Sequence, residues 1–106
     1  MSENVKVIAG IPACDEEKTI ARVVIGALRY TDKVIVVDDG SCDMTGEIAR
    51  RLGAEVIHHS ANLGKGAALR SIFKRTQQLD ADILVTLDSD GQHLPEEIPK
   101  VLSPIM

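Results

Sequence analysis

The chain has 106 residues, of which 44% are hydrophobic and 26% charged, and its formal net charge is −4. This composition is typical of one globular domain with an adequate core, which argues against disorder. The sequence has no run of about 18 apolar residues, so it predicts no membrane helix, and it shows no signal-peptide pattern. It also lacks the basic stretches and the aromatic side chains that commonly bind nucleic acid.

Strand-like and helix-like segments alternate along the first half of the chain. Residues 5–11 predict a strand that ends at Pro12. A helix is expected from about Glu16, with Asp15 as its N-cap, because apolar residues then recur at helical spacing. Residues 33–38 predict a second strand, which is almost continuously apolar, as expected for burial on both faces.

The second half continues this alternation. Its predicted elements are a helix over residues 44–52 with Gly53 as C-cap, a strand over 55–59, a loop over 60–66, a helix that runs to about Leu79, a strand over 83–87 and a short helix over 96–102. The spacing in the third helix places Leu69, Ile72, Phe73 and Thr76 on one inward face. Lys74 and Arg75 are expected on its exposed face.

The order of these elements predicts an α/β fold. Alternation with short connections indicates a parallel sheet covered by helices on both faces, a three-layer Rossmann-like arrangement. The expected strand order is 3-2-1-4, that of a mononucleotide-binding half sheet. The first and fourth strands are then neighbours where the winding reverses, and ligands bind there beyond the carboxyl ends of the strands.

Acidic residues gather directly after the first, second and fourth strands. Asp88 and Asp90 follow the fourth strand two residues apart, so their carboxylates are expected on the same side. Such a pair, with Gln92 as a third oxygen donor, can hold a hard divalent cation. The alternative is a capped turn, since Asp, Ser and Gly favour turns.

Two further segments have comparable alternatives. One carboxylate of Asp38 and Asp39 is expected to accept hydrogen bonds from a base or ribose. Asp-Gly also predicts a turn, however, and Ser41 or Asp43 is a candidate cap for the second helix. In the loop before the third helix, Gly64 and Lys65 can approach a phosphate.

The histidines and cysteines carry less information. We interpret His58 and His59, at the end of the third strand, as structural or solvated, whereas His93 directly follows the acidic pair and is a candidate site residue. Cys14 and Cys42 show no disulfide or zinc spacing. Free thiols are typical of a reducing compartment, so we expect a cytoplasmic location, with any contact to the membrane face made through a partner or a further segment.

Four segments together resemble the inverting glycosyltransferases of family 2, in the branch of dolichyl-phosphate-mannose synthase. They are Ile-Pro-Ala-Cys-Asp-Glu-Glu at 11–17, Val-Asp-Asp-Gly-Ser-Cys-Asp-Met-Thr at 37–45, Asn-Leu-Gly-Lys-Gly-Ala-Ala at 62–68 and Leu-Asp-Ser-Asp-Gly-Gln-His-Leu-Pro at 87–95. They span nearly the whole chain in the family's order. Cys14 stands where the family usually has Tyr, Asp15 where it has Asn, and Ile72 where Gly is common.

The resemblance implies a GT-A type fold and a role for each matched position. The residues expected at the nucleotide sugar are Pro12, Ala13, Cys14, Glu16, Asp38, Asp39, Gly40, Gly64, Lys65, Asp88 and Ser89. Asp88, Asp90 and Gln92 are expected to hold Mg²⁺ or Mn²⁺ against the diphosphate of a UDP- or GDP-linked sugar. The metal would neutralise charge on the leaving nucleoside diphosphate, while the sugar passes with inversion to an acceptor such as a polyprenyl phosphate or a glycan.

The family's catalytic domain is longer than this chain, which we therefore interpret as a single nucleotide-sugar-binding domain over residues 1–106, a truncated form of the sheet. The acceptor site and the general base are expected beyond Met106. The fourth strand would then expose an apolar edge, which predicts a homodimer or a partner chain. A non-catalytic nucleotide-binding or interaction module is the alternative function. A phosphatase of the haloacid-dehalogenase type, with Asp88 as nucleophile, would need a longer downstream sequence.

Overall fold

The structure, a computed structural model, describes residues 5–90. Its centre is a four-stranded parallel sheet in the order β3-β2-β1-β4. The strands are β1 (Val7–Ala13), β2 (Lys33–Asp39), β3 (Glu55–His59) and β4 (Ile83–Thr86). The predicted fold class and strand order are confirmed.

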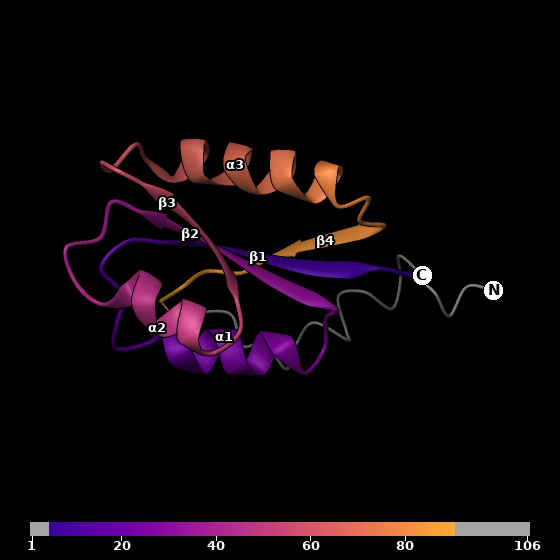
Figure 1. Cartoon of the computed structure of the whole chain (residues 1–106), viewed down its shortest axis with the longest axis horizontal. Coiled ribbons are helices and arrows are strands. Elements are labelled where there is room, and N and C mark those ends of the chain that lie inside the picture. Colours follow the sequence, from indigo (N-terminus) through magenta and orange to yellow (C-terminus); the bar gives the residue numbers. More distant parts are fainter. Residues whose placement is uncertain (1–4, 91–106) are drawn as a thin grey trace.

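Helices cover both faces of this sheet (Figure 1). Helices α1 (Ile20–Leu28) and α2 (Thr45–Arg51) lie together on one face, and α3 (Lys65–Gln78) lies on the other. The predicted helix over residues 96–102, together with Gln92 and His93, lies outside the described residues. Within residues 5–90, no helix has the length and apolar character needed to cross a bilayer.

The core follows from the apolar runs of the two central strands. Every residue of β2 from Val34 to Asp39 is buried, because α1 and α2 pack on one side of the strand and α3 on the other. Helix α3 packs closely on β1: a Cβ added to Gly10 would lie 2.4 Å from Cγ2 of Ile72. The absence of a side chain at Gly10 thus sets the distance between helix and sheet.

The prediction that the first strand ends at Pro12 is wrong, because Pro12 pairs with Val37 inside β1. The carbonyl of Gly10 accepts a hydrogen bond from Leu87 N–H, so the backbone N and C=O groups of Gly10 point toward β4. Those of Pro12, two residues further along the strand, point the same way. Pairing with β4 has already ended at Gly10. A residue without an N–H is therefore tolerated at this position of a central strand.

The start of α1 also differs from the prediction. The helix begins at Ile20 with Thr19 as its N-cap residue, and Asp15 does not cap it. Asp15 instead has a φ of 53°, and its Oδ1 accepts a hydrogen bond from Cys42 N–H at 2.7 Å. Tertiary contact with the loop after β2 has replaced the local cap.

Two side chains on α3 lie elsewhere than predicted. Phe73 is 50% exposed, because Ala68, Ile72 and Thr76 recur every four residues and form the buried line on their own. Arg75 is not merely a solubilising residue: its Nε lies 2.6 Å from Oε2 of Glu55 on β3. The predicted C-cap Gly53 also lies one residue beyond the observed one: α2 ends at Arg51 with Leu52 as its C-cap residue, and Gly53 follows with a φ of 108°.

Candidate functional site

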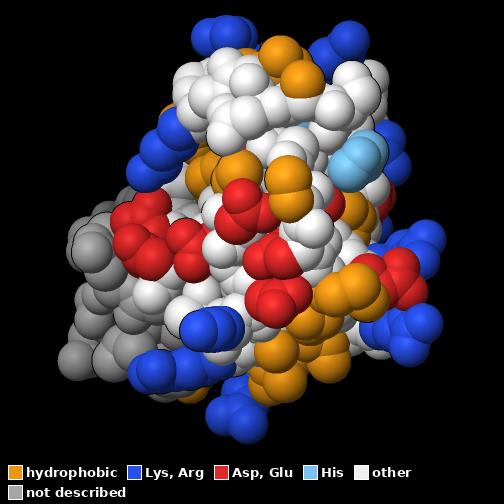
Figure 2. All heavy atoms as spheres, turned by 90° about the vertical axis from the view of Figure 1, so that its left-hand side faces the viewer, with side chains coloured by type: hydrophobic (Ala, Val, Ile, Leu, Met, Phe, Trp, Pro, Cys, Tyr) orange, Lys and Arg blue, Asp and Glu red, His pale blue; other side chains and the backbone are white. Residues whose placement is uncertain are grey.

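The carboxyl ends of the strands meet at one edge of the sheet, where Figure 2 shows acidic side chains across the middle of the face. A pocket of about 360 Å³ opens here, within the size range of ligand sites. Its lining residues come from the carboxyl ends of β1 and β2, from the segments after β1, β3 and β4, and from the start of α3: Pro12, Ala13, Cys14, Glu16, Asp39, Asn62, Gly64, Lys65, Ala68, Asp88, Ser89 and Asp90. The expected meeting of the strand ends is confirmed.

Asp39 forms one end of the pocket and is tightly held. It is 4% exposed, and its carboxylate accepts N–H donors from Leu63 at 2.9 Å and Gly64 at 2.9 Å. Its Oδ1 also lies 2.8 Å from Nδ1 of His59. Burial alone would raise the pKa of Asp39, but these hydrogen bonds outweigh it and lower the pKa. The group is therefore an ionised acceptor at neutral pH.

The other end of the pocket carries Asp88 and Asp90. The ammonium of Lys65 lies 3.0 Å from Oδ1 of Asp88, and both side chains are accessible, at 65% and 28%. The positive charge of Lys65 thus lies next to the Asp88 carboxylate. In residues 5–90, no group of three or more His, Cys, Asp or Glu is arranged to hold a metal ion. Mg²⁺ needs only one or two carboxylates, however, so Asp88 and Asp90 fit as its protein ligands.

The wall between the two ends is built from the segment that joins β1 to α1. The hydroxyl of Thr19 donates to the carbonyl of Ser89 at 2.6 Å, which ties this segment to the turn after β4. The N–H of Glu16 donates to Oγ1 of Thr45 at 2.8 Å, which ties it to α2. The pocket wall is therefore fixed by contacts that are distant in sequence.

Cys14 lines this wall but is not activated. Burial raises the pKa of its thiol, and the neighbouring Asp15 carboxylate raises it further. The side-chain amide of Asn62 donates to its sulfur at 3.2 Å. Both Cys14 and Cys42 are free thiols, as predicted.

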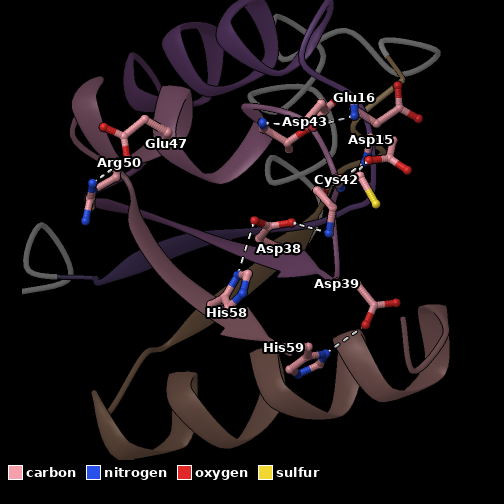
Figure 3. Close-up of polar contacts among 12 residues, drawn as sticks. Asp15, Glu16, Asp38, Asp39, Cys42, Asp43, Glu47, Arg50, His58 and His59 are labelled. Atoms are coloured by element: carbon pink, nitrogen blue, oxygen red, sulfur yellow. Dashed lines mark hydrogen bonds and ion pairs between the residues drawn. The ribbon is translucent and has the colours of Figure 1, made fainter. Parts of the chain in front are cut away.

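Two of the predicted nucleotide-sugar residues do not line the pocket. Asp38 points to the opposite face of the sheet from Asp39, as successive strand residues must, and lies 3.3 Å from Nδ1 of His58 (Figure 3). Gly40 has a φ of 72°, and an added Cβ would lie 2.5 Å from the backbone of Ala61 and Asn62. Gly40 does not line the pocket but allows the loop after β3 to lie close to the end of β2.

Sequence reasoning missed three residues of this region. Asn62 and Ala68 line the pocket directly, and His59 holds Asp39 from outside the lining. A signal for His59 was present, because two acids end the second strand and two histidines end the third. In the order 3-2-1-4 these strands are parallel neighbours, and the register pairs Asp38 with His58 and Asp39 with His59.

Comparisons with known proteins agree with this geometry. The sequence model described as "Glycosyl transferase family 2" matches residues 9–106. The UDP-N-acetylglucosamine–dolichyl-phosphate N-acetylglucosaminyltransferase of Methanococcus voltae is 40% identical over 91% of the chain and 45% of the relative. The undecaprenyl-phosphate mannosyltransferase of Micrococcus luteus is 33% identical over 94% of the chain and 44% of the relative. The chain thus spans less than half the length of these curated relatives.

Solved structures agree as well. Glucosyl-3-phosphoglycerate synthase from Mycobacterium tuberculosis, in complex with Mn²⁺, UDP and glucosyl-3-phosphoglycerate, superposes with a TM-score of 0.77 at 28% identity. The match covers 98% of the chain and 40% of that structure. The same enzyme in complex with Mg²⁺ and UDP gives a TM-score of 0.77.

Proposed function

Because the chain belongs to glycosyl transferase family 2, we propose that it is the nucleotide-sugar-binding part of a metal-dependent glycosyltransferase. The observation that carries this proposal is the polarity of the pocket. An ionised acceptor, Asp39, stands at one end, and Lys65 with two carboxylates, Asp88 and Asp90, stands at the other. A nucleoside diphosphate has the matching order: N–H and O–H donors on its base and ribose, then an anionic diphosphate that binds cations.

Four pocket residues then have a chemical role. Asp39 accepts a hydrogen bond from the base or ribose, and Lys65 binds the diphosphate, for which it has to exchange its partner Asp88. Asp88 and Asp90, with Gln92, hold Mg²⁺ or Mn²⁺. A bound metal ion stabilises negative charge on the leaving nucleoside diphosphate. The complexes of the mycobacterial synthase with UDP and Mn²⁺ or Mg²⁺ support this assignment.

We propose that the sugar passes with inversion to an acceptor bound outside this chain's pocket. Polyprenyl phosphates are the favoured acceptors, because two relatives are named for dolichyl phosphate and undecaprenyl phosphate. The acceptor site and the general base are placed in the part of the family's domain that the chain does not span. The two free thiols support a cytoplasmic location.

We also retain the prediction that the β4 edge pairs with a second copy of the chain. In residues 5–90, β4 pairs only with β1, and a strand with unpaired backbone groups favours such association. Sedimentation over a wide concentration range measures this directly. A species that stays monomeric at the highest concentration contradicts the prediction.

Isothermal titration calorimetry with UDP and GDP, each with and without Mn²⁺, tests the proposed function. One of the two nucleotides is expected to bind, and Mn²⁺ should tighten its binding. Asp88→Asn should abolish the effect of Mn²⁺, whereas the matched control Asp80→Asn, an exposed acid beyond the other end of α3, should preserve it. No binding of either nucleotide at millimolar concentration would refute the proposal.

A further inference from the structure

The ring of His59 bridges the pocket acid Asp39 and a serine on α3. Its Nδ1 lies 2.8 Å from Oδ1 of Asp39, and its Nε2 lies 2.9 Å from Oγ of Ser71. Figure 3 shows the ring at the end of β3, beside α3, turned toward Asp39. The His59 side chain is only 12% exposed. The ring is therefore held in one orientation by partners from two different elements.

The directions of these hydrogen bonds follow from the chemistry of the partners. Asp39 is an ionised carboxylate, which can only accept, so Nδ1 of His59 must donate to it. Nε2 then accepts from the Ser71 hydroxyl when the ring is neutral, or donates to it when the ring is protonated. Because the Ser71 hydroxyl can both donate and accept a hydrogen bond, either form of the ring keeps the bond from Nδ1 of His59 to Asp39.

This bond restricts how the Asp39 carboxylate can turn. Oδ1 accepts from His59 and from Leu63 N–H, while Oδ2 accepts from Gly64 N–H. The two backbone donors belong to the loop before α3, whereas His59 belongs to the neighbouring strand β3. Without the ring, each carboxylate oxygen would keep one donor, and both donors belong to the loop before α3, so Asp39 would no longer be tied to the neighbouring strand.

From this arrangement we propose that His59, oriented by Ser71, is a positioning residue that fixes the Asp39 carboxylate for hydrogen bonding to the nucleoside part of the ligand. This inference rests on the proposed function of the pocket. His59 does not line the pocket itself, so it acts through Asp39. Its neighbour His58 offers an internal comparison, since it is 63% exposed and contacts Asp38 on the other face of the sheet.

The test compares His59→Leu with His59→Asn by calorimetry, using whichever of UDP and GDP binds the wild type in the presence of Mn²⁺. His59→Leu removes the donor to Asp39 and should weaken binding about tenfold. His59→Asn places an amide N–H near the position of Nδ1 and should stay within about threefold of the wild type. The control His58→Leu should bind as the wild type does.

A second measurement needs no nucleotide. The amide protons of Leu63 and Gly64 report on Asp39 through their hydrogen bonds, and their NMR signals should move in His59→Leu and return toward the wild-type positions in His59→Asn. Ser71→Ala, which keeps the ring, should weaken nucleotide binding about twofold to threefold and carries the test if His59→Leu does not fold.

The outcomes separate the two proposals. If neither nucleotide binds the wild type, the proposed function fails, while the amide signals still report whether His59 orients Asp39. If a nucleotide binds and His59→Leu binds it as tightly as the wild type does, the inference is overturned. It is also overturned if His59→Asn binds as weakly as His59→Leu, because His59 would then have a purely structural role.

Discussion

The two ends of the pocket hold their carboxylates in opposite ways. Asp39 is 4% exposed and is fixed by donors from β3 and from the loop before α3. Asp88 is more accessible, and its ion pair is with Lys65, a long side chain that is itself 65% exposed. Both acids stand at the same edge of one sheet, so position in the sheet explains the difference. Strand β2 lies between two neighbours, whereas β4 pairs with β1 alone in the described part of the chain.

This difference suggests what each end can do. The side chain of Asp39 loses its conformational entropy during folding and not on binding, so the carboxylate is preorganised to accept a hydrogen bond from a ligand. An exposed ion pair contributes about 0–1 kcal/mol and is easily exchanged, so Lys65 can leave Asp88 for a diphosphate at little cost. Changes at the Asp39 end should therefore affect both folding and binding, whereas changes at the Lys65 end should affect binding alone.

The largest effect is expected from Gly40→Ala. The residue combines a φ of 72° with a Cβ position 2.5 Å from the Ala61 and Asn62 backbone, so the loop that reaches Asp39 must move. We expect a loss of about 3 kcal/mol in the free energy of unfolding, measured by urea denaturation. The control Gly66→Ala lies in the first turn of α3, where an added Cβ would make only an ordinary contact, 3.6 Å from Nη1 of Arg70, and it should be neutral or slightly stabilising. A loss at Gly40 equal to that of the control would contradict this account.

Asp39→Asn is expected to come second. An amide has only one acceptor oxygen, so it cannot replace both carboxylate oxygens that accept from Leu63 N–H and Gly64 N–H, and one of these part-buried donors loses its bond to residue 39. Gly64 N–H keeps its second acceptor, Oδ1 of Asn62. The expected loss is about 2 kcal/mol of stability together with nucleotide affinity. Thermal unfolding and calorimetry measure the two effects, with Asp80→Asn as the control. Unchanged stability in Asp39→Asn would show that the acid is not fixed as described.

Lys65→Met tests the opposite end of the pocket. Because its ion pair with Asp88 faces solvent, the free energy of unfolding should change by less than about 1 kcal/mol. Binding of UDP or GDP should nevertheless weaken severalfold, whereas Lys74→Met, an exposed lysine of α3 outside the pocket, should have no effect. If Lys65→Met destabilised the fold as much as Asp39→Asn, the contrast between the two ends would be lost.

The smallest effect is expected away from the pocket, at Glu55 on β3. Its hydrogen bond with Arg75 lowers the pKa of Glu55 below 4.5 against the opposing effect of burial, and Lys33 lowers it further. Because the folded-state pKa is depressed, this stabilisation is present above about pH 4.5 and is lost as the pH falls through the folded-state value.

Glu55→Gln should therefore cause a small loss of stability at pH 7, and the difference from the wild type should disappear in acid. Urea denaturation at a series of pH values measures this difference, and nucleotide binding should not change. A difference as large at pH 3 as at pH 7 would mean that the charge of Glu55 does not contribute.

The sequence by itself determined the layered fold, the strand order and most of the pocket lining. Continuous apolar runs mark buried parallel strands, and polar residues directly after them must meet at one edge, so Asp39 and Asp88 could be placed without coordinates, and the glycine loop before the third helix indicated Lys65. The motif resemblance to family 2 added Pro12 and gave Glu16 its role at the nucleotide. These inferences use local patterns and the few topologies that such patterns permit.

Tertiary structure alone decided which partners these side chains take. The extension of β1 through Pro12 depends on where β4 stops pairing. The late start of α1 depends on contact between Asp15 and Cys42, and the pairing of Asp39 with His59 depends on the register of β2 and β3. Hydrophobic periodicity records which face a residue occupies, but a hydrogen bond between residues 20 positions apart depends on how two strands are aligned. That alignment is set by packing over the whole sheet.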